Sequence, residues 1–245
     1  MTRKMFFLLI FLFLTPIQLF GAELKLATLE WEPYIYSHSD QGYVAQLVKM
    51  AFANSDYEVK LSFFPWARAV YVARNGTFAG YFPEYYSKKR AEEFHFSESF
   101  SAAPLVLFKR KKDVIEYSNL RDLEPYTIAV VRGYVNTEEF DKATYLRKEK
   151  TQSDLQSFKM LMGGRVNLVV ADKYVGYYLI KNYLPESLEF IDVIERPLEM
   201  KKLYLCVSKQ HPDAVKILQT FNNGLRNMRD NGFLENLKQR FFLLK

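Results

Sequence analysis

Cysteine is almost absent from this chain of 245 residues, because Cys206 is the only one. No internal disulfide can form. The fold must therefore be stabilised by its core, for which 49% hydrophobic and 16% aromatic residues provide ample material. Histidine is scarce as well, and His38, His95 and His211 lie far apart, without the spacing of a metal site. We predict neither a bound metal nor a cofactor.

Long apolar runs are also lacking, and the most prominent one stands near the N-terminus, at residues 5–14. Its length is too short to cross a bilayer, which needs about 20 residues. A short basic flank precedes the run and Gly21 and Ala22 follow it, a pattern typical of a secretory signal peptide. We predict that residues 1–22 are this peptide and that the mature protein is periplasmic. An uncleaved anchor is the alternative. The sequence has no cysteine near the predicted cleavage site, so we do not expect a lipid anchor.

Positive charge exceeds negative charge only slightly. Without residues 1–22 the chain keeps 32 basic and 28 acidic residues, a net charge of +4. The basic residues are scattered, and their one dense run, residues 109–112, is flanked by Asp113 and Glu116. Nucleic-acid-binding surfaces show clustered positive charge with exposed aromatic residues. We therefore predict no nucleic-acid partner.

Apolar periodicity predicts alternating strands and helices in the first third of the chain. Residues 24–28, 57–63 and 78–82 have the pattern of strands, and residues 46–54 and 66–74 have that of helices. Strands and helices that alternate at such short intervals are typical of a parallel sheet covered by helices. The sequence thus predicts an α/β lobe here.

The rest of the chain continues in the same style. Strands are predicted at 127–131, 166–171 and 203–207, and helices at 135–146, 154–162, 173–182 and 213–245, the last with a break near Asn231 and Gly232. These elements indicate a second α/β lobe. Because no low-complexity linker separates the two sets, we expect ordered strands near 102–109 and 199–207 to join the lobes.

Several short motifs, taken in their order along the chain, resemble those of one protein family. They are Trp31-Glu32-Pro33-Tyr34, Ser87-Lys88-Lys89-Arg90 followed by Phe94-His95-Phe96-Ser97, Val131-Arg132-Gly133, Val169-Val170-Ala171-Asp172, and Arg229-Asp230-Asn231-Gly232-Phe233. Together they resemble the bacterial extracellular solute-binding proteins of family 3, which include the periplasmic polar amino-acid-binding proteins of ABC transporters. The resemblance covers essentially the whole mature chain.

This resemblance implies an α/β fold of the type II periplasmic-binding-protein kind. In such proteins each of two lobes holds a mostly parallel sheet flanked by helices, two hinge strands join the lobes, and the C-terminal helices return to the first lobe. Lobe 1 would then comprise residues 23–105 and 205–245, and lobe 2 residues 106–204. The ligand is expected in the cleft between the lobes, at the carboxyl ends of the strands.

The resemblance places Arg90 at the position that holds a ligand's α-carboxylate and Asp172 at the position that holds its α-ammonium. A guanidinium can meet a carboxylate bidentately, and a carboxylate at a strand end can neutralise an ammonium. The alternatives are a solvated Arg90 in a basic run and an Asp172 that caps the following helix. Asp172 can fill both roles.

The two tryptophans fall on expected walls of the same ligand site. The resemblance puts Trp31 where an aromatic ring stacks on the ligand and Trp66 on a second wall, and such faces suit a planar or cationic ligand. Burial in the core is the alternative for both rings. Arg68 lies two residues after Trp66 and points either toward the cleft or out to water.

Arg132, Gly133 and Tyr134 lie on a loop before a predicted helix. Free backbone N–H groups at a helix start can receive an anionic group, and Arg132 adds positive charge there. A tight turn that requires glycine is the competing explanation for Gly133, and it does not exclude ligand contact.

The sequence departs from the family pattern in two segments. Residues 44–46 lack the acidic residue that the family often has, and residues 83–85 replace its usual serine or threonine with Pro83, Glu84 and Tyr85. The proline removes a backbone donor. Tyr85 can supply a phenolic hydroxyl to the ligand, and Glu84 can favour a cationic one. The amino-acid clamp is thus incomplete, and we expect either an amino acid or a related small polar solute.

We expect a monomeric binding protein without catalytic activity, which delivers its solute to an inner-membrane ABC permease. One alternative is a periplasmic enzyme on the same scaffold, similar to cyclohexadienyl dehydratase, with Asp172 or Glu84 as its general acid. Another is a ligand-sensing module that acts in trans on a membrane receptor.

Overall fold

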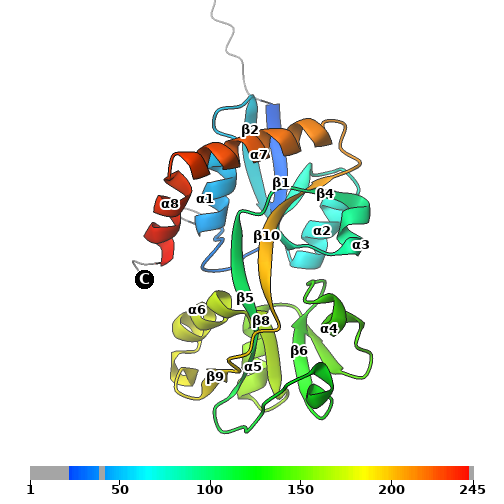
Figure 1. Ribbon diagram of the computed structural model, residues 1–245, viewed down its shortest axis with the longest axis vertical. Helices are drawn as coiled ribbons and strands as arrows, with labels where there is room; N and C mark the ends of the chain where they lie inside the picture. The colour runs from blue at the N-terminus through cyan, green and yellow to red at the C-terminus, as the bar shows by residue number, and fades with distance from the viewer. Residues whose placement is uncertain (1–21, 39–41, 243–245) are drawn as a thin grey trace, which may run out of the picture.

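Two long antiparallel strands, β5 (Ser101–Arg110) and β10 (Glu199–Ser208), run between two lobes (Figure 1). The structure is a computed structural model that describes residues 22–38 and 42–242. The predicted signal peptide lies outside the described residues, apart from Ala22. Within those residues no helix is long and apolar enough to cross a membrane.

The first lobe, at the top of Figure 1, is built on strands in the order β2-β1-β3-β10. Strand β1 runs parallel to β2 and β3, whereas β10 is antiparallel to β3 and to the short β4. The elements are β1 (Ala22–Thr28), α1 (Gly42–Ala51), β2 (Tyr57–Phe63), α2 (Trp66–Arg74), β3 (Gly80–Tyr85), α3 (Lys88–Glu93), β4 (Phe94–Phe96), α7 (Ala214–Asp230) and α8 (Phe233–Phe242).

The second lobe is built on strands in the order β5-β8-β6-β7. Strand β6 runs parallel to β7 and β8, and β9 pairs with β5. The elements are the 3₁₀ turn η1 (Leu120–Leu123), β6 (Thr127–Val131), α4 (Glu138–Lys142), β7 (Arg147–Thr151), α5 (Asp154–Met162), β8 (Leu168–Asp172), α6 (Lys173–Tyr183), the 3₁₀ turn η2 (Pro185–Ser187) and β9 (Ile191–Val193).

Strand β5 changes its partner where the chain passes from one lobe to the other. Residues 101–105 pair with β10, and residues 105–109 pair with β8. Leu105 belongs to both ladders and is 2% exposed. The hinge is therefore an ordered part of the sheet. The exact division into lobes at residues 105/106 and 204/205 stays a prediction.

Helix α7 brings the end of the chain back to the first lobe, where it packs against α1 (Figure 1). Phe221 of α7 lies 5.7 Å from the ring of Phe52, just beyond α1. Gly224 of the same helix has no room for a side chain, because a Cβ would collide with the carbonyl of Ala51. Glycine thus allows the two helix backbones to approach closely.

The strands at 57–63 and 127–131 and the helices at 66–74 and 154–162 have their predicted bounds. The predicted helix at 135–146 is wrong. Instead, α4 spans only Glu138–Lys142 and the edge strand β7 follows it. Of the β7 residues only the last, Thr151, is buried, so this strand has no apolar alternation that a sequence pattern could reveal.

Candidate functional site

Two adjoining cavities lie between the lobes, where the carboxyl ends of β1, β3 and β6 meet. The smaller cavity, which Pro83, Glu84 and Tyr85 help to line, has a volume of about 20 Å³, and we call it the inner cavity. The larger one, which Asp154 and Tyr183 help to line, has a volume of about 880 Å³, and we call it the outer cavity. The inner one has room for about one water molecule, whereas the outer one falls within the range of about 300–1,000 Å³ that ligand pockets occupy. Leu29, Trp31, Trp66 and Tyr134 line both.

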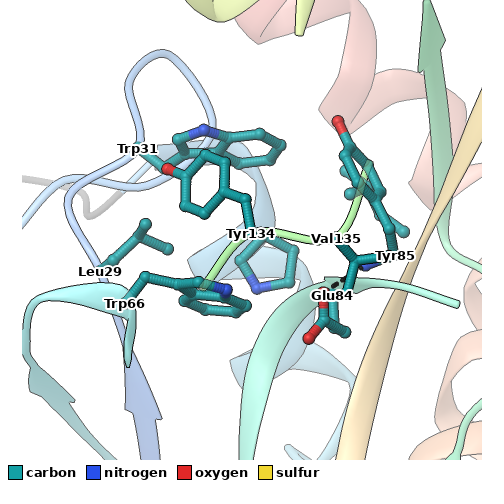
Figure 2. Close-up of a pocket in the computed structure, with 9 residues that line it drawn as sticks. Leu29, Trp31, Trp66, Glu84, Tyr85, Tyr134 and Val135 are labelled. Atoms are coloured by element: carbon teal, nitrogen blue, oxygen red, sulfur yellow. Dashed lines mark hydrogen bonds between the residues drawn. The ribbon is translucent and has the colours of Figure 1, made fainter. Parts of the chain in front are cut away.

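Aromatic rings from both lobes line the inner cavity (Figure 2), and those of Trp31, Trp66 and Tyr134 also line the outer one. The ring of Trp66 lies 6.1 Å from that of Tyr134 and perpendicular to it. Trp31 stacks on Tyr34 at 4.8 Å and meets Tyr85 edge-on at 6.3 Å. The two tryptophans are 7% and 5% exposed, and yet both reach the cavities. Burial and a place at the cleft are thus compatible here.

Asp172 stands at the end of β8 and is 3% exposed. Its Oδ1 accepts the backbone N–H groups of Tyr174 and Val175, so it caps α6 as the sequence suggested. The hydroxyls of Tyr34 and Tyr85, from the other lobe, also donate to this carboxylate at 3.3 Å. Burial raises the pKa of Asp172 to about 7, although these hydrogen bonds oppose the shift. Asp172 therefore joins the lobes, and contact with a ligand stays a prediction.

Arg90 forms an ion pair with Glu84, with 2.8 Å between Nε and Oε2. Both side chains are withdrawn from water, at 12% and 2% exposure. Burial raises the pKa of Glu84, and the Arg90 guanidinium opposes that shift. Nη2 of Arg90 donates to the carbonyl of Gly133 at 3.0 Å and so bridges the lobes. Arg90 is thus not a solvated arginine, and its side chain lines neither cavity.

The structure does not bring Arg68 and Arg132 to the cavities. Both residues are exposed, and the guanidinium of Arg68 lies 5.7 Å from the ring centre of Phe64. The backbone N–H of Tyr134 already donates to the carbonyl of Val131, and α4 begins only four residues later. Gly133 adopts a φ of 85°, the turn conformation that glycine favours. The tight turn is therefore present, and an anion site on this loop stays a prediction.

Sequence reasoning missed Asp154, the first residue of α5 and a lining residue of the outer cavity. This side chain is 5% exposed. Its Oδ2 accepts the Tyr134 hydroxyl at 3.0 Å, whereas no described residue donates a hydrogen bond to its buried Oδ1. Burial raises the pKa of Asp154 to about 6, against the hydroxyl of Tyr134 and the indole of Trp31, which favour the charged form.

A position just beyond a parallel strand was the signal that could have revealed Asp154. The strand in question is β7, and the sequence pattern did not reveal it. Sequence reasoning also missed a contact at the rim of the cleft. There the Tyr183 hydroxyl of α6 donates to Glu32 of the first lobe at 2.5 Å.

The part of the chain that the structure describes holds no group of three or more histidine, cysteine, aspartate or glutamate side chains that could bind a metal ion.

A family model for bacterial extracellular solute-binding proteins, family 3, matches residues 24–244. The chain belongs to this family. No curated protein sequence matches it significantly.

Solved structures show where this family member stands among related folds. A histidine kinase sensor domain with similarity to periplasmic binding proteins has a TM-score of 0.81 at 18% identity, over 91% of this chain and 97% of that one. An ancestral arginine-binding protein bound to arginine has 0.79 at 17%, over 91% and 99%. An ancestral amino acid-binding protein, a precursor of cyclohexadienyl dehydratase, has 0.73 at 18%, over 90% and 95%. These likenesses confirm the predicted two-lobed α/β fold.

Proposed function

We propose that this chain is a periplasmic binding protein that encloses a small polar solute, an amino acid or a related compound, in the cleft between its lobes. It would act as a monomer and deliver the solute to an ABC permease of the inner membrane. The observation that carries this proposal is the pair of cavities between the lobes, walled by aromatic rings from both sides. Such concave, mostly apolar sites with a few polar groups are typical of small-molecule binding.

Polar contacts across the cleft support a closing motion. Tyr34 and Tyr85 reach Asp172, Arg90 reaches the carbonyl of Gly133, and Tyr183 reaches Glu32. Each of these contacts breaks if the lobes swing apart on β5 and β10. A solute that contacts both lobes would add to them and shift the population toward the closed form.

The ligand contacts that we propose are Trp31, Trp66, Tyr85 and Tyr134, with Asp172 beside them. An inner cavity of about 20 Å³ leaves no room for an amino acid while Tyr134 lies between the tryptophans. We therefore expect the solute to occupy the outer cavity or to displace the Tyr134 ring toward it. In both cases the indole faces would form its walls.

The test is to purify the mature protein, denature it and identify any co-purified small molecule by mass spectrometry. That compound should then raise the melting temperature of the refolded protein, because a ligand stabilises the state that it binds. Trp66→Ala should reduce this shift, and an exposed aromatic on the same helix, Tyr71→Ala, serves as the control. Absence of any solute, together with no stabilisation by a panel of amino acids and amines, would contradict the proposal.

One observation favours catalysis as the second candidate. A carboxyl group whose pKa is raised by burial to about 7, as at Asp172, is protonated in about half of the molecules at neutral pH and can act as a general acid. Incubation with prephenate or arogenate tests this candidate. Formation of an aromatic product that Asp172→Asn abolishes would make the chain a dehydratase, and its absence would leave binding as the function.

A further inference from the structure

The charged side chains that line the two cavities are nearly all acidic. Glu84, whose charge is paired with that of Arg90, lines the inner cavity, and Glu30, Glu32 and Asp154 line the outer one. His38 is the one basic side chain there, and among the described residues no lysine or arginine lines either cavity. Carboxylates gathered in a cleft with low-dielectric walls attract cations and repel anions.

Asp154 differs from the other three carboxylates because one of its oxygens is buried without a hydrogen-bond donor. Each of the others accepts a hydrogen bond, from the guanidinium of Arg90 to Glu84, from the hydroxyl of Tyr183 to Glu32, and from the backbone N–H of Ser37 to Glu30. Oδ1 of Asp154 is buried without such a donor, at a residue 5% exposed. A buried acceptor left without a partner is costly, so this oxygen fits a donor that a ligand supplies.

Aromatic rings surround the same position. Tyr134 donates its hydroxyl to Oδ2 of Asp154, and the indole of Trp31 also favours the charged form of this carboxylate. Trp66 completes the wall, with its ring 6.1 Å from that of Tyr134. Aromatic faces attract ammonium groups through the ring quadrupole, most strongly where water is excluded. The carboxylate and the rings therefore favour the same ligand group.

A ligand carboxylate finds no such partner in the cavities. The guanidinium of Arg90 is held by Glu84 on one side and by the Gly133 carbonyl on the other. Lys201 of the hinge strand lies 5.4 Å from the ring centre of Tyr85, pairs with Glu199, and lines neither cavity. An anionic group in the cleft would thus face carboxylates without a free cation.

We infer that the solute is an organic amine without a carboxylate, and that its ammonium group donates to Oδ1 of Asp154 between Trp31 and Tyr134. This inference rests on the proposed function and narrows its solute class. It also assigns the charge recognition to Asp154, in place of Arg90. The amine group must carry N–H donors, because a quaternary ammonium would leave Oδ1 unpaired.

The experiment compares pairs of compounds that differ by one carboxylate: putrescine and L-ornithine, cadaverine and L-lysine, agmatine and L-arginine. L-Glutamate and choline are added as an anionic and a quaternary probe. Isothermal calorimetry and the shift in melting temperature measure binding to the mature wild type, to Asp154→Asn and to Glu149→Gln. Glu149 lies on the exposed edge strand β7, so its variant removes one negative charge of the same lobe outside the cleft.

We expect at least one of the three amines to bind more tightly than its carboxylate-bearing partner and more tightly than choline. Asp154→Asn should weaken that binding by between about 10-fold and 100-fold, the range for a hydrogen bond to a charged group, and Glu149→Gln should not. Tighter binding of an amino acid in these pairs, of L-glutamate or of choline would overturn the inference and leave the proposed function standing. If no compound of either charge binds, both fail. Should Asp154→Asn not fold, the wild-type pairs decide alone.

Discussion

The buried ion pair between Arg90 and Glu84 allows a sharp test of how the cleft is held together. Arg90→Ala leaves the Glu84 carboxylate, 2% exposed, without its cation and removes the donor to the Gly133 carbonyl. Loss of one partner from a buried ion pair costs about 3–5 kcal/mol, because the remaining charge stays buried. At about 2–4 °C per kcal/mol for a chain of this size, the melting temperature should fall by roughly 6–20 °C.

The loss should depend on pH in a defined direction. Burial already raises the pKa of Glu84 with the guanidinium present, and its removal raises that pKa further. The folded variant then binds a proton that the unfolded chain, with a glutamate pKa of about 4.3, releases. Stability of Arg90→Ala therefore declines as the pH rises above about 4.3 and is regained as the pH falls toward that value.

Urea denaturation followed by circular dichroism at pH 5.0 and pH 7.5 measures both effects. Glu84→Gln in the Arg90→Ala background is the matched control, because a neutral amide of the same shape removes the unpaired charge. It should recover most of the stability lost at pH 7.5. A loss below about 1 kcal/mol, the value of an exposed pair, or an equal loss at the two pH values would refute the reasoning.

Three further changes test other parts of the structure. Asp172→Asn keeps an acceptor for the α6 cap and removes a carboxyl whose pKa is raised by burial to about 7. The wild type should lose stability between about pH 4 and pH 7, because the unfolded chain releases this proton at a lower pH than the folded chain does. In parallel urea titrations the variant should lose less stability over this range. Tyr183→Phe deletes the hydroxyl that donates a hydrogen bond to Glu32 and should destabilise the closed form by about 0.5–3 kcal/mol. Small-angle scattering should then show a larger radius of gyration. An unchanged radius would count against this contact. Gly224→Ala forces a methyl group against the backbone of Ala51. It should destabilise the folded protein by about 1–3 kcal/mol, although alanine has the better helix propensity. A variant that melts at or above the wild-type temperature would show that α7 can shift.

Much of the fold could be predicted because buried strands and helices have apolar residues in continuous runs or at regular spacing in the sequence. Strand β6 (Thr127–Val131) has four buried apolar residues in succession, and α5 (Asp154–Met162) buries one face, so both were found with their bounds. Strand β7 has the sequence RKEKT at the edge of the sheet and buries one residue. Hydrogen bonds to a single neighbour stabilise it, and such bonds leave no pattern of side chains.

The candidate site could be predicted only in part, for a related reason. A family position gives the place of a side chain, whereas its chemistry depends on which neighbours reach it in space. Asp172 stands at the strand end where it was expected, and Arg90 lies beside the cleft. Glu84, six residues before Arg90, turns at the end of β3 to meet that guanidinium, and no spacing rule forecasts this pairing.

This pairing changes the electrostatics of the whole cleft. A guanidinium free of partners would offer an anion site in the first lobe, opposite the acidic residues of the second. With Glu84 buried against it, the charge of Arg90 is neutralised locally and its remaining contact goes to the Gly133 carbonyl. The other charged side chains that line the cavities, Glu30, Glu32 and Asp154, are then negative. Glu84 at the end of β3 thus accounts for the contact by which Arg90 bridges the lobes, and it underlies our proposal that the solute is a cation, since both follow from the loss of a free positive group.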